Sequence, residues 1–202
     1  MIRVVARFVV GAALVGLMAG CSSGGQKPPK VTVPPSAVAG SPTPSPTPTG
    51  ESVIDASDPK LGIVFTKMPE LTGDAASALN GLSVFEVAAW RATTAGKVDP
   101  ILVLIASPEV LRMVQGQVDG NITRGITIHG TLTVTVNVTS ADSTTAVGTS
   151  CQDFTRMNYT SAEGTFTAAE GGIVDKYFFD VTLFRPNGGG WIVDTYNRNG
   201  TC

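Results

Sequence analysis

The chain has 202 residues, 43% of them hydrophobic and 15% charged, and a formal net charge of −2. Its 14 lysine and arginine residues are scattered, so no basic patch indicates a nucleic-acid partner. A chain of this length is sufficient for one folded domain and an additional segment.

The first 20 residues have the features of a secretory signal peptide. Arg3 and Arg7 lie at its start, and an apolar run follows from Phe8 to Met18. This run is shorter than the roughly 20 residues that a membrane-spanning helix needs. It leads into the sequence LMAGC, which ends at Cys21 and resembles the bacterial lipobox, although Met18 stands where leucine is usual.

The lipobox resemblance implies cleavage before Cys21 and attachment of diacylglycerol to its thiol. Removal of residues 1–20 leaves 182 residues with a formal net charge of −4. We therefore expect a lipoprotein held by its lipid anchor on the extracytoplasmic face of the cell membrane.

Residues 21–57 are rich in proline, serine and threonine. Eight of the 13 prolines lie between Pro28 and Pro48. Proline removes backbone donors and favours polyproline II, so this segment is predicted to be a semi-rigid, disordered spacer. About 30 residues at about 3 Å each would place the folded domain, residues 58–202, up to about 90 Å from the membrane.

The first part of the domain has helical periodicity. Apolar residues at helical spacing predict a helix that begins near Thr72 and ends at Gly96: Ala78, Leu82, Phe85 and Ala89. Asp99-Pro100 begins a second, short helix over residues 101–106, which we expect to be buried because it is apolar on every side. Ser107 begins a third helix that runs to about residue 117.

The remainder alternates between apolar and polar residues, as strands do. One long strand is predicted over residues 126–138, with a bend at Gly130, and others over 144–153, 174–184 and 191–197. Residues 156–172 are predicted to form a loop. Helices followed by four antiparallel strands predict an α+β domain with the helices on one sheet face.

This order of elements resembles the NTF2-like (SnoaL-like) fold. The sequences CQD at residues 151–153, GWIV at 190–193 and GTC at 200–202 also resemble those of secreted actinobacterial lipoproteins. The resemblance covers residues 58–202 and implies a cone in which N-terminal helices pack on a curved four-stranded antiparallel sheet. It implies no activity, because this superfamily includes enzymes, binding proteins and scaffolds.

Only two thiols remain once Cys21 is lipidated. Cys151 and Cys202 are an even pair in an exported chain, which predicts a disulfide. His129 is the only histidine and lies among threonines on a polar strand face, so we assign no metal site and no cofactor.

The predicted inward strand faces carry no acid except Asp175 at a strand end. We therefore assign no catalytic residue and do not expect an enzyme, although Glu86 on the first helix can still point inward. A register that pairs Val181 with Val193 would also place Asp180 opposite Asp194. Such a like-charged pair would raise one carboxyl pKa or hold a cation, unless water and nearby basic residues screen it.

Three aromatic residues are predicted on the polar sheet face: Phe178, Phe184 and Tyr196. An exposed aromatic patch usually marks a contact, so we expect a homodimer interface or cover by the loop at residues 156–172.

Three functions are consistent with the sequence. The leading hypothesis is a non-catalytic binding module for a protein or envelope component. The alternatives are a carrier of a small apolar ligand or lipid in the cone cavity, and a SnoaL-like enzyme. A filled cavity favours the first, a dry apolar one the second, and an empty cavity with a polar end the third.

Overall fold

The computed structural model describes residues 50–173 and 175–202. The predicted signal peptide, Cys21 and the spacer as far as residue 49 lie outside the described residues. Residues 50–57, the last of the predicted spacer, lie along the first helix: the backbone N–H of Ile54 donates to Asn80 Oδ1 at 2.9 Å, and the Asn80 amide donates to the Ser52 carbonyl oxygen at 2.9 Å.

Helix α1 spans Gly73–Ala95 and contributes much of the core. It ends, as predicted, at Gly96, whose φ of 63° is the left-handed conformation that glycine adopts without strain. Gly81 lies in mid-helix because the helix passes directly over Trp191: a Cβ built at Gly81 would be 2.7 Å from the Trp191 Cβ.

Helices α2 (Leu102–Ile105) and α3 (Pro108–Thr123) follow. The Ser107 hydroxyl caps α3 by accepting a 3.2 Å hydrogen bond from the backbone N–H of Val110. The prediction that the α2 segment is buried was wrong, because a single helical turn presents only one side to the core. Leu102 is buried, whereas Val103 and Leu104 are 63% and 72% exposed.

The main sheet has five strands in the order β1-β3-β4-β7-β8. Their bounds are Ile63–Phe65 (β1), Leu132–Ala141 (β3), Thr145–Asp153 (β4), Lys176–Phe184 (β7) and Ile192–Arg198 (β8). Strand β1 runs parallel to β3, and the other pairs are antiparallel. The α+β class holds, but the predicted NTF2-like cone with a four-stranded antiparallel sheet is wrong: the sheet is five-stranded and mixed.

A second, three-stranded sheet follows the order β2-β5-β6. It consists of Thr127–Gly130 (β2), Met157–Ser161 (β5) and Gly164–Thr167 (β6). The residues predicted as one long strand therefore belong to two sheets, and the predicted loop contains a hairpin. The break falls at Gly130, where φ is 101° and where any Cβ would collide with the carbonyl oxygen of Arg156.

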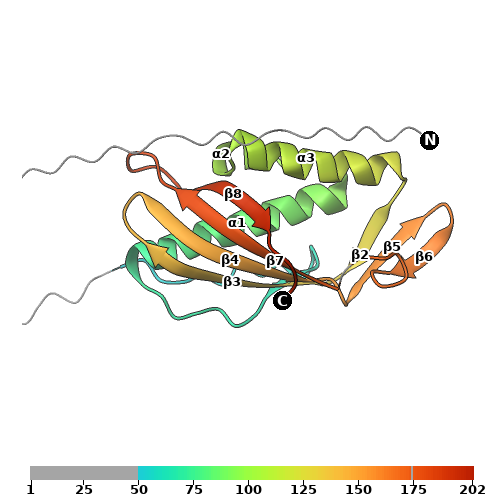
Figure 1. Ribbon diagram of the computed structural model, residues 1–202, viewed down its shortest axis with the longest axis horizontal. Coiled ribbons are helices and arrows are strands. Elements are labelled where there is room, and N and C mark those ends of the chain that lie inside the picture. Colours follow the sequence, from blue (N-terminus) through green and yellow to red (C-terminus); the bar gives the residue numbers. More distant parts are fainter. Residues whose placement is uncertain (1–49, 174) are drawn as a thin grey trace, which may run out of the picture. The chain divides into compact units, whose positions relative to one another are not determined.

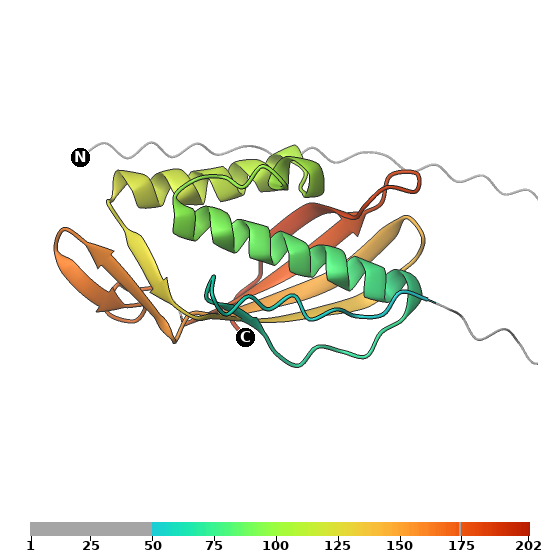
Figure 2. The same ribbon diagram turned by 180° about the vertical axis from the view of Figure 1, so that it is seen from behind.

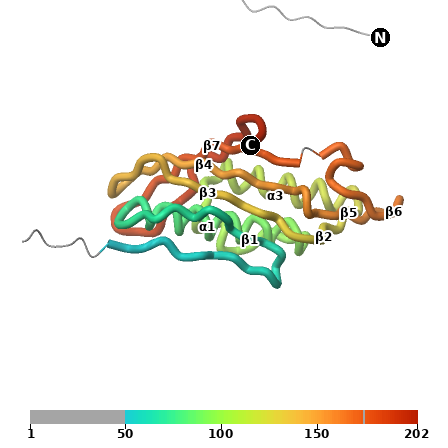
Figure 3. The backbone as a smooth tube through the Cα atoms, turned by 90° about the horizontal axis from the view of Figure 1, so that it is seen from below, coloured from blue at the N-terminus to red at the C-terminus, as the bar shows by residue number. Residues whose placement is uncertain are grey.

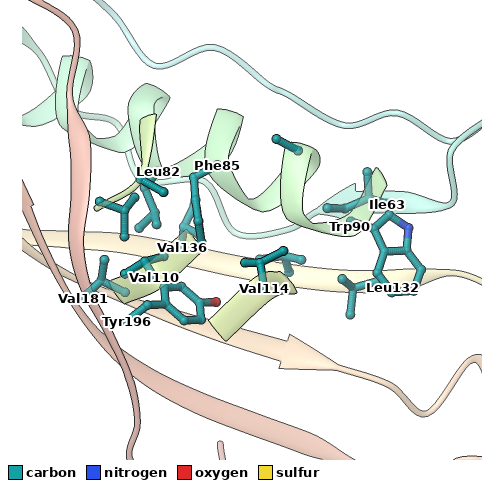
Figure 4. Close-up of a cluster of buried hydrophobic side chains, with 14 of the residues drawn as sticks. Ile63, Leu82, Phe85, Trp90, Val110, Val114, Leu132, Val136, Val181 and Tyr196 are labelled. Atoms are coloured by element: carbon teal, nitrogen blue, oxygen red, sulfur yellow. The ribbon is translucent and has the colours of Figure 1, made fainter. Parts of the chain in front are cut away.

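Helices α1, α2 and α3 lie on one face of the five-stranded sheet (Figures 1 and 2), and the three-stranded sheet lies beyond one end of it (Figure 3). The core forms between the helices and the inner sheet face (Figure 4). Alternate residues of β3 supply this face: Leu132, Val134, Val136 and Val138. The threonines between them lie on the outer face, as the period-2 pattern predicts.

The register of β7 and β8 differs from the prediction. Leu183 pairs with Val193, but a bulge between Thr182 and Leu183 changes the register of the preceding residues of β7, so that Thr182 pairs with Thr195. Asp180 is therefore opposite Asn197 rather than Asp194, and the Asn199 amide donates to its carboxylate at 2.6 Å. The predicted like-charged pair does not form.

Candidate functional site

Glu86 is an acidic side chain in the centre of the domain. It lies on the face of α1 that packs against the sheet and is 1% exposed. Four residues before it, Leu82 is fully buried, and four residues after it, Trp90 is 5% exposed. The 3.6-residue helical period therefore carries the carboxyl group inward together with the apolar residues.

Two sheet residues hold the Glu86 carboxyl group. The Tyr196 hydroxyl, from β8, donates to Oε1 at 2.6 Å. The amide of Gln152, from β4, donates to Oε2 at 2.8 Å and to the Tyr196 oxygen at 3.0 Å. These three side chains form a closed hydrogen-bonded triangle, which we call the Glu86 triad.

Burial dominates the electrostatics of the Glu86 triad. Desolvation raises the pKa of Glu86 above its ordinary value, although the hydroxyl of Ser150 and the donors Tyr196 and Gln152 act in the opposite direction. Burial, and then the adjacent Glu86 carboxylate, raise the pKa of Tyr196. No salt bridge to Glu86 occurs among residues 50–173 and 175–202. When Glu86 ionises, the side chains that donate to its carboxylate are therefore neutral.

Ser150 completes the inner surroundings of Glu86. It lies two residues before Gln152 on β4 and is fully buried. Its hydroxyl is close enough to lower the pKa of Glu86, yet no group in the described part of the chain meets it in hydrogen-bonding geometry. The Ser150 hydroxyl is thus a buried polar group without a hydrogen-bond partner among the described residues, next to a buried acid.

Two adjacent cavities lie next to the Glu86 triad. The inner cavity has a volume of about 30 Å³, room for about one water molecule, and is lined by Glu86. The outer cavity has a volume of about 300 Å³. Both are lined by Trp90, Gln117, Gln152 and Phe154, so the two cavities adjoin, and the inner one is the one that Glu86 lines.

Aromatic rings form one wall of these cavities. Phe154 packs edge-on against Tyr177 at 5.4 Å between centroids, and Tyr177 packs against Phe179 at 6.3 Å. The Phe179 ring centroid lies 4.4 Å from that of Tyr196. Figure 4 shows the Tyr196 ring among the core side chains. A continuous row of rings therefore connects the outer cavity to the Glu86 triad.

Polar and basic side chains also line the outer cavity. Asn121 and Arg124, near the end of α3, line it together with Arg198 at the end of β8. The Arg198 guanidinium lies 3.8 Å from the centroid of the Tyr177 ring. Larger hollows of about 420 and 480 Å³ are more open to solvent, and neither is lined by Glu86 or Asn121.

Of the residues predicted from sequence, the cysteine pair is confirmed. A disulfide joins Cys151 to Cys202, with Cα atoms 6.1 Å apart. The C-terminal segment reaches it by pairing with β7, where the Asn199 N–H donates to the Phe178 carbonyl oxygen at 2.7 Å. Cys151 lies on the outer sheet face, away from the cavities, and Cys21 lies outside the described residues.

The remaining predicted residues do not converge on a site. His129 is exposed on β2, and no group of three metal-ligating side chains occurs within the described ranges. Of the predicted aromatic patch, Tyr196 faces inward, Phe178 is half-buried and Phe184 is 37% exposed. The homodimer stays a prediction.

Sequence reasoning missed the Glu86 triad as a unit. The signal for Glu86 was present, since the residue lies beside the apolar stripe of the first helix. Tyr196 was assigned to the outer face because the bulge in the β7–β8 pairing is not visible in the alternation of residues.

Comparison with known proteins assigns no family. No family model matches the chain, and no curated protein does. The intermembrane-space region of the chloroplast protein ARC6 is similar to it at 17% identity with a TM-score of 0.47, over 66% of this chain and all of that one. A de novo designed β-sheet protein is also 17% identical, with a TM-score of 0.34, and the match covers 61% of this chain and 89% of the designed protein. Neither score reaches 0.5, so neither similarity assigns a fold family or a function.

Proposed function

We propose that the protein is a membrane-anchored extracytoplasmic lipoprotein whose folded domain binds a small amphipathic molecule in the outer cavity. One observation carries the binding role: a cavity of about 300 Å³ is lined by aromatic side chains and adjoins a buried, hydrogen-bonded carboxyl group. Concave, largely apolar sites with a few placed polar groups are where proteins bind small ligands.

The chemistry of the lining supports an amphipathic ligand. Trp90, Phe154 and Tyr177 offer flat apolar surfaces, whereas Gln117, Asn121 and Gln152 offer amide groups. The volume lies at the small end of the range for ligand sites, which favours a compact molecule over a complete membrane lipid. Trp90 is fixed in place, because its indole N–H donates to the Leu61 carbonyl oxygen at 3.1 Å.

A blocking variant and a matched control test this role. Gln117 lies on the exposed side of α3 and lines both cavities, whereas Gln115, on the same helix, lines neither. Calorimetric titration would use three probes that share a phenylbutyl group and differ only in the head group: 4-phenylbutyrate, 4-phenylbutan-1-ol and 4-phenylbutylamine. We expect at least one to bind, with affinity reduced at least tenfold by Gln117→Phe and unchanged by Gln115→Phe. If no probe binds, or if both variants behave alike, the proposal is wrong.

The lipid anchor is proposed from the signal sequence and the lipobox resemblance. In the part of the chain that the structure describes, no helix is both long and apolar enough to cross a bilayer. Cys21→Ala should abolish incorporation of labelled fatty acid and move the protein from the membrane fraction to the soluble fraction. Unchanged membrane association of the variant would contradict the anchor.

Acid–base catalysis is a second candidate, favoured by one observation. Glu86 is a carboxyl group with a raised pKa beside a cavity, which is how proteins prepare such a group for proton transfer. It ranks below binding because both Glu86 oxygens already accept hydrogen bonds from Tyr196 and Gln152. Turnover of a cavity ligand that Glu86→Gln abolishes, with ligand affinity retained, would support catalysis.

A further inference from the structure

We infer that the outer cavity takes an organic acid, with the carboxylate of the ligand at Asn121, Arg124 and Arg198 and its apolar body along the aromatic wall. This inference rests on the proposed binding function and adds the chemical class and the orientation of the ligand.

Asn121 supplies the first argument. Its side chain is 8% exposed and lines the outer cavity, and its Nδ2 has no hydrogen-bond partner among the described residues. Arg124 Nη2 donates to Asn121 Oδ1 at 3.3 Å, which fixes the orientation of the amide and leaves the N–H₂ group as the free end. A buried donor without a partner is destabilising, and a ligand oxygen that reaches it removes this penalty, whereas an ammonium group does not.

The two arginines supply the second argument. Arg91 and Arg185 each have a carboxylate partner, Asp99 and Asp74 respectively. No such salt bridge is formed by Arg124 or Arg198 within the described ranges, and no acidic residue lines the outer cavity.

The geometry of the two guanidinium groups leaves N–H groups for a ligand. Arg124 is held in place because its Nε donates to the Gly120 carbonyl oxygen at 2.9 Å, and Arg198 by its position over the Tyr177 ring. Guanidinium groups whose N–H groups are not all used bind carboxylates in paired hydrogen bonds.

Glu86 determines the orientation. A ligand carboxylate in the inner cavity would lie beside a buried acid whose neighbouring donors, Tyr196 and Gln152, are already used. The acid group of the ligand therefore lies near the arginines rather than beside Glu86. Arg124, the C-cap of α3, is seven positions after Gln117, a rise of about 10 Å along the helix axis, which matches the length of a short aryl-alkyl acid.

The same three probes distinguish this inference from the binding function itself, because they differ only in the head group. We expect 4-phenylbutyrate to bind at least tenfold more tightly than 4-phenylbutan-1-ol, and 4-phenylbutylamine to bind most weakly. Arg198→Gln should weaken 4-phenylbutyrate five- to tenfold and leave the alcohol unchanged. Arg156→Gln is the control, because Arg156 is exposed and lines neither cavity.

Each outcome has one meaning. If no probe binds, the proposed binding function fails, and the inference fails with it. If the alcohol or the amine binds as tightly as the acid, or if Arg198→Gln and Arg156→Gln have the same effect, the ligand class is wrong although the cavity binds ligands. A preference for the acid that only Arg198→Gln removes supports the inference.

Discussion

The hydroxyl of Tyr196 donates a 2.6 Å hydrogen bond to Glu86, a residue 110 positions earlier in the chain. This bond joins the first long helix to the last strand across the core. It places a polar contact where both side chains are buried, next to a cavity lined by aromatic rings. The buried acid, its two donors and the cavity together distinguish this domain from one whose interior is filled by apolar side chains.

The first prediction concerns pH. Burial raises the pKa of Glu86 from its ordinary value of 4.5, so the folded protein retains a proton that the unfolded chain releases. The corresponding stability is fully present below about pH 4.5 and is lost as pH rises through the folded-state pKa. Glu86→Gln, which cannot ionise, should therefore gain stability relative to the wild type between pH 5 and pH 8. Urea unfolding at both pH values measures this, and a relative loss toward pH 8 would contradict it.

The second prediction concerns the Tyr196 hydroxyl. Tyr196→Phe removes the donor to Glu86 and the acceptor of Gln152, so it should lower the free energy of unfolding by about 1–3 kcal/mol. Tyr159→Phe makes the same chemical change at a hydroxyl for which the described residues provide no hydrogen bond, and it should cost less. Equal losses in the two variants, measured by chemical denaturation, would show that the bond contributes nothing specific.

The third prediction concerns the disulfide. The Cys151–Cys202 bond has a sequence separation of 51 residues, and the chain-entropy model gives about 4 kcal/mol for a loop of that size. Cys202→Ser should lower the free energy of unfolding by roughly this amount. The double variant Cys151→Ser/Cys202→Ser should lose no more than the single one, because both lack the same bond. If the Cys202→Ser variant has the same free energy of unfolding as the oxidised wild type, the structural role of the bond is contradicted.

The fourth prediction concerns the contact between α1 and β8. Gly81→Ala would place a Cβ 2.7 Å from Trp191 Cβ, and overpacking of this kind costs about 1–3 kcal/mol. The gain in helix propensity, about 1 kcal/mol, offsets only part of this cost. Gly116→Ala in α3 meets no atom within 4 Å and should be stabilising. Thermal unfolding of both variants tests the prediction, and stabilisation by Gly81→Ala would contradict the close packing.

The sequence predicted what depends on local pattern. The period of 3.6 residues located α1 and its end at Gly96, and the alternation of residues located β4, β7 and β8 to within about two residues. The disulfide followed from the count of cysteines once Cys21 was assigned to lipid attachment. These features need no knowledge of which segments pair in space.

The errors concern long-range pairing. Strand β1 has only three residues and joins the sheet in parallel beside β3, which no local pattern indicates. The bend at Gly130 was expected, but not that it separates two sheets. Because of the bulge at Thr182/Leu183, Tyr196 points inward and not outward as predicted, so its contact with Glu86 was missed.

Ligand binding in the outer cavity is tested most directly by nuclear magnetic resonance during titration with 4-phenylbutyrate. The side-chain N–H signals of Trp90, Asn121 and Gln152 come from the cavity lining, whereas the Trp191 indole N–H does not. We predict saturable shifts of the first three signals and little change in Trp191. Saturable shifts that include Trp191 but not the cavity residues, or no shifts at all, would contradict binding in the cavity.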